Sequence, residues 1–157
     1  MAVTDHDAAP VSTGVTGLDH ILAGGYASQR SHLIEGRPGS GKTTLAMQFL
    51  LDGVRRGERC LYITLSESRR ELLNVAERHG WSLDGIEICE LVAPELSLDP
   101  GQQQSLVHSS DLELGETVRM AIAEIERLKP QRVVFDSLSE IRLLSQGSLR
   151  YRRQVHA

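Results

Sequence analysis

The chain is poor in aromatic residues, in cysteine and in long apolar runs, and each scarcity narrows the possibilities. Its 157 residues include only two cysteines, which excludes a small scaffold held together by several disulfides. No apolar run approaches the roughly 20 residues that a membrane-spanning helix needs, so we expect no membrane protein. The net charge of −4 disfavours a broad nucleic-acid interface.

Other short features of the sequence give little support for secretion, metal binding, reactive thiols or nucleic-acid binding. The first residues lack the basic start and the apolar stretch of a secretory signal, so we expect a cytoplasmic location. The six histidines form neither an i,i+4 pair nor an H-E-x-x-H pattern, which gives a protein-held transition metal little support. Cys60 and Cys89 each lie in a short apolar run and are expected to be buried, reduced and inert. The locally basic residues 150–153 are interpreted as a solvated helix face rather than a nucleic-acid contact.

What the chain does contain is a series of short apolar runs that predict strands. They cover residues 31–35, 60–65, 86–92 and 132–136. Strands that alternate with helices imply an α/β fold, with a parallel sheet covered by helices on both faces and ligands at the carboxyl ends of the strands. We expect one domain over residues 13–157, preceded by a flexible polar leader at residues 1–12.

Helical periodicity appears in three stretches between these strands. Their apolar positions are, in turn, Leu45, Phe49, Leu50 and Val54, ending at Gly57; Leu72, Val75 and Ala76, ending at Gly80; and Val118, Ala121, Ile122, Ile125 and Leu128, ending before Pro130. A capping-box pattern at residues 110–113 predicts the start of the third helix. The turn-rich residues 94–110 predict a surface loop.

The strongest motif is GRPGSGKT at residues 36–43, which matches G-x-x-x-x-G-K-[ST] between a predicted strand and a predicted helix. Backbone N–H groups of such a loop wrap phosphate oxygens, its glycines allow close approach, and the helix N-terminus adds its dipole. The motif predicts ATP binding by Gly36, Pro38, Gly39, Ser40, Gly41, Lys42, Thr43 and Thr44. Lys42 supplies a charge to the β and γ phosphates, and Thr43 places its hydroxyl on Mg²⁺.

Two acidic residues lie at the carboxyl ends of predicted strands. Asp136 ends an apolar strand as a Walker B acid does, where it would act with Thr43 at the Mg²⁺ site and hold a water molecule on the metal. The next residue is Ser137 and not Glu, which argues against ATPases whose catalytic carboxylate directly follows that acid. Glu67 follows the second strand and is a candidate to activate the attacking water. From position alone, a surface or helix-capping glutamate is an equally good interpretation of Glu67.

The combination of motifs resembles a known family. The segment STGVTGLDHILAGG at residues 12–25 precedes the loop, LYITLSES follows at residues 61–68, HGW at 79–81, and VVFDS at 133–137. Together they resemble the KaiC-like branch of the RecA superfamily over nearly the whole chain after the leader. The resemblance implies an ATPase that assembles into rings, typically homo-hexamers, with Mg-ATP at subunit interfaces.

The resemblance also bears on single residues. It favours Glu67 as the catalytic base, and Trp81 as a buried packing anchor. The family often has two adjacent acids where this chain has Ser66 and Glu67, so we expect slow hydrolysis that depends on Glu67 alone. Family members continue for roughly eighty residues beyond this region, including a strand that inserts beside the Walker B strand, so the chain is expected to be the N-terminal part of a domain.

Two other functions are compatible with the sequence. One is a recombinase-like DNA-binding relative, although the net charge makes nucleic acid an unexpected partner. The other is a non-catalytic signalling module in which ATP controls the binding of an unknown protein partner.

Overall fold

In the computed structural model, residues 8–91 and 106–139 can be described, with side chains from residue 115 onward in the second range. The elements in chain order are α1 (Thr16–Ile21), α2 (Lys42–Arg55), β1 (Cys60–Thr64), α3 (Arg69–Arg78), β2 (Ile86–Glu90), α4 (Leu106–Leu128) and β3 (Arg132–Asp136).

The three strands form a parallel sheet in the order β2-β1-β3. All five residues of the central strand β1 are buried, as expected for an apolar strand with neighbours on both edges. The register places Thr64 opposite Glu90 on one side and opposite Asp136 on the other. The carboxyl ends of the strands therefore meet at one edge of the sheet, where a ligand site was expected.

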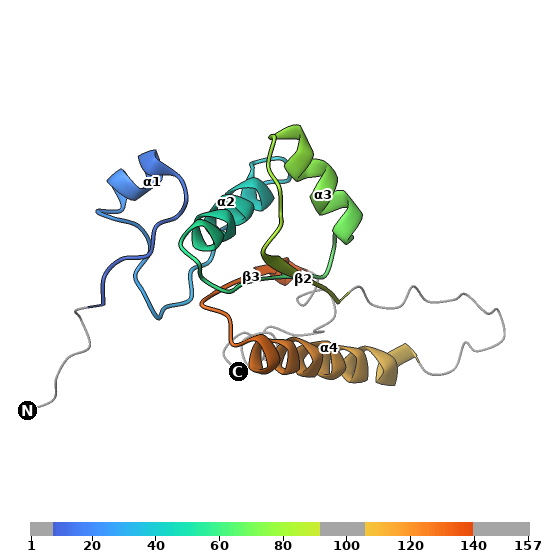
Figure 1. Ribbon diagram of the computed structural model, residues 1–157. Coiled ribbons are helices and arrows are strands. Elements are labelled where there is room, and N and C mark those ends of the chain that lie inside the picture. Colours follow the sequence, from blue (N-terminus) through green and yellow to red (C-terminus); the bar gives the residue numbers. More distant parts are fainter. Residues whose placement is uncertain (1–7, 92–105, 140–157) are drawn as a thin grey trace, which may run out of the picture.

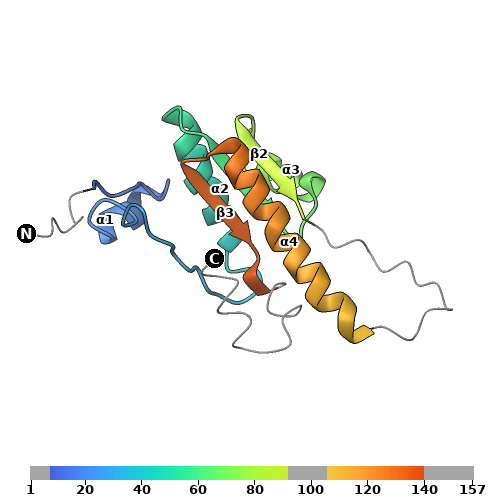
Figure 2. The same ribbon diagram turned by 90° about the horizontal axis from the view of Figure 1, so that it is seen from below.

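Helices cover both faces of this sheet. In Figure 1, α2 and α3 lie above the strands and α4 lies below them; Figure 2 shows α4 running across the other face. Successive residues of β1 point to opposite faces, so Cys60 and Tyr62 pack with α2 and α3, whereas Leu61 and Ile63 pack with α4. The predicted α/β fold with a helix-covered parallel sheet is confirmed.

Local chemistry explains two helix starts. α2 begins directly after Gly41, whose φ of 88° is in the left-handed region. Gly41 has no side chain that could cap the helix. α3 begins at a capping box in which Ser68 and Glu71 each bond the other's backbone N–H.

The glycine- and aspartate-containing segment after the leader folds back on itself. Asp19 accepts hydrogen bonds from the Ser12 hydroxyl at 2.6 Å, the Thr13 hydroxyl at 2.6 Å and the Thr13 N–H at 2.7 Å. These bonds lower the pKa of Asp19, with the Ser12 bond contributing most. Val11 forms an antiparallel bridge with Tyr26, which brings the two ends of the segment together.

Gly14 allows this segment to pack closely against α2. Its φ is 80°, and a Cβ there would lie 2.2 Å from the backbone oxygen of Gln48. Glycine is therefore required for so close an approach to the helix.

Two predictions about strands were wrong in part. Residues 31–35 form no strand: they are exposed, with Leu33 73% and Ile34 39% accessible, and no described strand pairs with them. An extended apolar run becomes a strand only when a neighbour satisfies its backbone groups. β3 was expected to be buried, but it is an edge strand of the described sheet, and Val133 is 38% exposed.

The third predicted helix also differs from expectation. α4 begins at Leu106, so residues 106–110 are helical and the pattern at residues 110–113 lies inside the helix. Ser and Asp lower helix propensity by only about half a kcal/mol, too little to stop a helix. Ile122 and Ile125 of the predicted apolar stripe are 38% and 36% exposed, whereas Ala121 is buried against the sheet.

Both cysteines are free thiols in strands, Cys60 buried and Cys89 only half-buried. Burial raises the pKa of Cys60 to about 11 and also raises that of Cys89, so burial disfavours the reactive thiolate form at both positions. Trp81 is half-buried, stacks on His79 and packs against the core beside α2.

Some predictions fall outside the described residues: the leader up to residue 7, the predicted loop up to residue 105, and the basic residues 150–153. In the part of the chain that is described, no helix is both long enough and apolar enough to cross a membrane.

Candidate nucleotide site

The glycine-rich loop lies exposed between the extended residues 31–35 and the start of α2. Gly39 and Gly41 have φ values of 79° and 88°, which other residues rarely adopt. At Gly36 the restriction is spatial, since a Cβ would lie 2.5 Å from the Ser40 hydroxyl oxygen. A side chain at Gly39 or Gly41 would therefore strain the backbone of this turn, and one at Gly36 would require the Ser40 side chain to move.

Lys42 reaches back over this turn. Its ammonium group donates to the carbonyl oxygens of Gly36 at 2.9 Å and Arg37 at 3.1 Å. No side chain caps the N-terminus of α2, so its first N–H groups keep their hydrogen-bonding capacity. A lysine charge beside an uncapped helix N-terminus fits a bound polyphosphate. Pro38 lies in the loop itself, and Thr44 in the first turn of α2.

Thr43 and Asp136 meet although 93 positions separate them in sequence. The Thr43 hydroxyl donates to Oδ2 of Asp136 at 3.1 Å. The same oxygen accepts a hydrogen bond from the Tyr62 hydroxyl at 2.6 Å. Oxygen ligands of this kind suit Mg²⁺, which binds few protein groups and keeps several waters.

Glu67 lies at the same edge of the sheet. The buried Thr64 hydroxyl donates to the Glu67 carbonyl at 2.7 Å and accepts from the Glu67 N–H at 3.0 Å, which fixes the turn after β1. Among the described side chains, Oε2 of Glu67 is buried without a hydrogen-bond partner. Burial, followed by the negative charge of Asp136, raises the pKa of Glu67. A half-buried carboxylate with one buried, unfilled acceptor oxygen suits a proton-accepting role.

The structure therefore brings together most of the residues that the motifs singled out. The loop leads into α2, Thr43 lies in the first turn of that helix, Glu67 follows β1, and Asp136 ends β3. Ser66, the departure from the family pattern, is exposed. The sequence interpretation assigned no role to Tyr62 or Thr64. Their even spacing with Cys60 on one strand was the available signal, because it places all three on the face toward α2.

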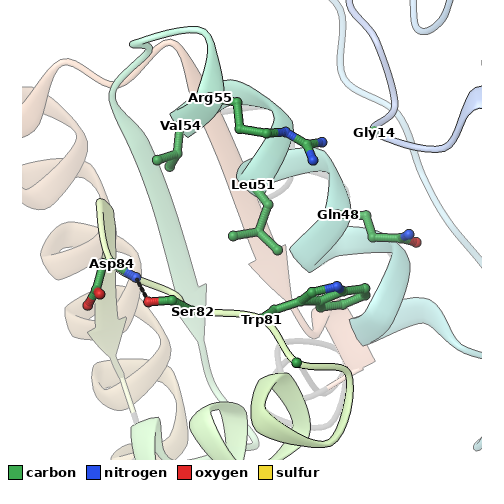
Figure 3. A pocket seen from close by; sticks show the side chains of 9 residues that line it. Gly14, Gln48, Leu51, Val54, Arg55, Trp81, Ser82 and Asp84 are labelled. Atoms are coloured by element: carbon green, nitrogen blue, oxygen red, sulfur yellow. Dashed lines mark hydrogen bonds between the residues drawn. The ribbon is translucent and has the colours of Figure 1, made fainter.

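A separate pocket of about 350 Å³ lies beside the later turns of α2. Figure 3 shows Trp81 and Leu51 lining it, with Gln48 and Arg55 along its helical side. None of its lining residues belongs to the glycine-rich loop or to the acidic edge of the sheet. It is therefore distinct from the candidate nucleotide site.

A parallel sheet covered by helices, with a glycine-rich loop leading into α2, defines an α/β protein that contains a P-loop. The family model described as "ATPase: KaiC" matches residues 11–157. The chain thus belongs to the KaiC family of ATPases.

Relatives of two kinds match the chain. A UPF0273 protein from Thermotoga maritima is 31% identical over 139 residues, covering 83% of this chain and 56% of the relative. The circadian clock oscillator protein KaiC from Prochlorococcus marinus is 35% identical over 132 residues, covering 82% of this chain and 26% of the relative. A UPF0273 protein from Pyrococcus horikoshii is 32% identical, and 55% of its length is covered. The chain thus spans about half or about a quarter of these relatives' lengths.

Proposed function

We propose that this chain binds Mg-ATP in its glycine-rich loop and that the complete protein hydrolyses ATP slowly. The observation that carries the proposal is the 3.1 Å hydrogen bond between Thr43 and Asp136. It joins the loop to the end of a strand far away in sequence, at the place where a bound triphosphate needs oxygen ligands for its metal.

Each group has a role in this proposal. Backbone N–H groups of the loop and of the first turn of α2 cradle the phosphates. Lys42 exchanges its bonds to the carbonyls of Gly36 and Arg37 for bonds to phosphate oxygens. Thr43 would hold Mg²⁺ directly and Asp136 through a water molecule. When bound there, Mg²⁺ neutralises charge on the phosphates.

Glu67 is proposed to accept a proton from the attacking water. Its buried, unpartnered Oε2 is available for that water, and the turn held by Thr64 fixes its backbone. Ser66, where the family often has an acid, adds no second carboxylate. Hydrolysis therefore depends on one base and is expected to be slow.

The extent of the domain belongs to the same proposal. We infer that residues 13–157 are part of a larger ATPase domain, which assembles into a ring with ATP between subunits. Two exposed apolar side chains support this inference: Leu33, and Val133, which is 38% exposed on edge strand β3. The greater length of the relatives supports it as well. A further strand pairing with β3 would cover this apolar edge.

The test of binding is calorimetric titration with Mg-ATP of the chain and of two variants. Lys42→Ala should abolish measurable binding, because the phosphates lose the charge inside the cradle. Lys129→Ala, which removes a lysine beyond the end of α4, is the matched control and should bind normally. Unchanged affinity of Lys42→Ala would refute the loop assignment.

The test of extent compares the 157-residue chain with a polypeptide about eighty residues longer at its C-terminus. The longer protein should form a defined oligomer by size exclusion, melt at higher temperature with ATP and release phosphate. Because the chain itself is proposed to bind ATP, stabilisation by ATP does not distinguish the two polypeptides; a monodisperse 157-residue monomer that hydrolyses ATP as fast as the longer protein would refute the larger domain.

A further inference from the structure

Tyr62 brings a phenolic hydroxyl to the acidic end of β3. Its side chain is 2% exposed in the centre of the sheet, and its hydroxyl donates to Oδ2 of Asp136 at 2.6 Å. The Thr43 hydroxyl donates to the same oxygen at 3.1 Å. Two hydroxyls from different elements therefore converge on one carboxylate oxygen.

The strand register explains why Tyr62 reaches this position. Tyr62 lies opposite Val134, and Thr64 lies opposite Asp136. Tyr62 and Asp136 are thus diagonal neighbours on the face of the sheet toward α2, a separation that a long aromatic side chain spans. The bond runs along the sheet to the carboxylate, while the ring packs among Met47, Leu50 and Leu72.

Packing alone does not account for the hydroxyl. A phenylalanine ring would fill nearly the same volume, and burying a hydroxyl costs free energy unless it finds a partner. Here the partner is a carboxylate, and a hydrogen bond to a charged group is shorter and stronger than one between neutral groups. The 2.6 Å separation fits such a bond.

We propose that Tyr62 is a positioning residue for Mg-ATP binding, which holds the Asp136 carboxylate in one orientation beside Thr43. The inference rests on the proposed Mg-ATP site. Thr43 alone bonds Oδ2 at one point and leaves the carboxyl group free to rotate. The second bond to the same oxygen, from the rigid central strand, restricts that rotation, and Oδ1 takes part in neither bond. In this proposal Oδ1 is the acceptor for a metal-bound water.

The role predicts an effect that depends on the metal. Without Mg²⁺, ATP contacts the loop and Lys42, and the orientation of Asp136 matters little. With Mg²⁺, a freely rotating Asp136 holds its water less well. Tyr62→Phe should therefore reduce the extra affinity that Mg²⁺ confers by about tenfold, the scale of one hydrogen bond to a charged group, and leave affinity in EDTA unchanged.

The experiment is calorimetric titration of the chain with ATP in excess Mg²⁺ and in EDTA, with circular dichroism to verify folding of each variant. Tyr26→Phe is the matched control, because it also removes a phenolic hydroxyl but its ring packs on His32 and Phe49. It should change neither affinity. Equal losses in Mg²⁺ and in EDTA for Tyr62→Phe would show a packing role and overturn the inference.

A double-mutant cycle separates action through Asp136 from independent action. In an Asp136→Ala background, which removes the acceptor of the Tyr62 hydroxyl, Tyr62→Phe should change the Mg²⁺-dependent affinity by less than about twofold. A full tenfold loss in that background would mean that Tyr62 does not act through Asp136. If the unaltered chain binds no ATP under either condition, the proposed function itself fails. If it binds and Tyr62→Phe retains the full gain from Mg²⁺, the positioning role alone fails.

Discussion

Replacing Arg132 by Met should destabilise the chain more than any change at a surface arginine. Arg132 is the first residue of β3, and its side chain is 2% exposed. Its guanidinium donates to the carbonyls of Ser12 at 3.0 Å and Phe49 at 2.8 Å. It also pairs with Asp52 at 3.1 Å and with Glu58. One buried cation therefore joins the N-terminal segment, α2 and the start of β1 to the edge strand.

The expected loss follows from what methionine leaves behind. Met fills much of the same length but offers no donor, so two carbonyls and the Glu58 carboxylate lose a partner. Breaking a buried ion pair costs about 3–5 kcal/mol. Asp52 keeps its bond to Arg56 at 2.7 Å, and the Glu58 side chain is 26% exposed, so solvent and other cations recover part of that cost. We expect a loss of about 3 kcal/mol, a large fraction of a typical folding free energy.

Urea unfolding followed by circular dichroism measures this loss as a lower midpoint at an unchanged slope. Arg127→Met is the control, because Arg127 pairs with Glu124 on the exposed face of α4. Such surface pairs contribute little, and its midpoint should remain that of the unaltered chain. Equal midpoints for the Arg132 and Arg127 variants would refute the assignment of Arg132 as the link between these elements.

Three further predictions concern the site and the N-terminal segment. In a polypeptide carrying the complete domain, Glu67→Gln should keep ATP affinity but lower phosphate release by about 10² or more; Ser66→Ala should change little, and an equal loss there would refute the carboxylate role. Thr43→Val should weaken ATP binding mainly with Mg²⁺, so an equal loss in EDTA would exclude a metal contact. The lowered pKa of Asp19 means that its stabilisation is present above its ordinary value near 3.8 and is lost as pH falls through the lower folded value. Asp19→Asn should flatten that acid dependence in urea midpoints measured from neutral to acidic pH.

Local sequence was sufficient for most individual elements. β1, β2 and α3 lie where apolar runs and periodicity predicted them. The loop and the beginning of α2 follow from the glycine pattern, because few other residues adopt the backbone angles of Gly39 and Gly41. These features depend on residues close together in the chain, so a short window of sequence contains their causes.

The predictions of a strand at residues 31–35 and of a buried apolar stripe on α4 failed for one physical reason. Burial and strand pairing depend on partners that are distant in sequence. Residues 31–35 have a strand-like composition but no neighbouring strand among the described residues. Ile122 was expected in an apolar stripe facing the sheet, yet it is 38% exposed, because packing decides which part of a stripe is covered. Local periodicity determines which residues share a face but not what lies against that face.

The candidate site shows the same division between sequence and tertiary structure. The sequence by itself specifies a phosphate-binding loop and two acids that each follow an apolar strand, because these patterns are local. Only the tertiary structure decides that Thr43 meets Asp136 and that Tyr62 bonds the same carboxylate oxygen. Those contacts depend on the parallel register of β1 with β3 and on the seating of α2 over that face. Register between strands more than sixty residues apart comes from the packing of the whole sheet, which no local pattern contains.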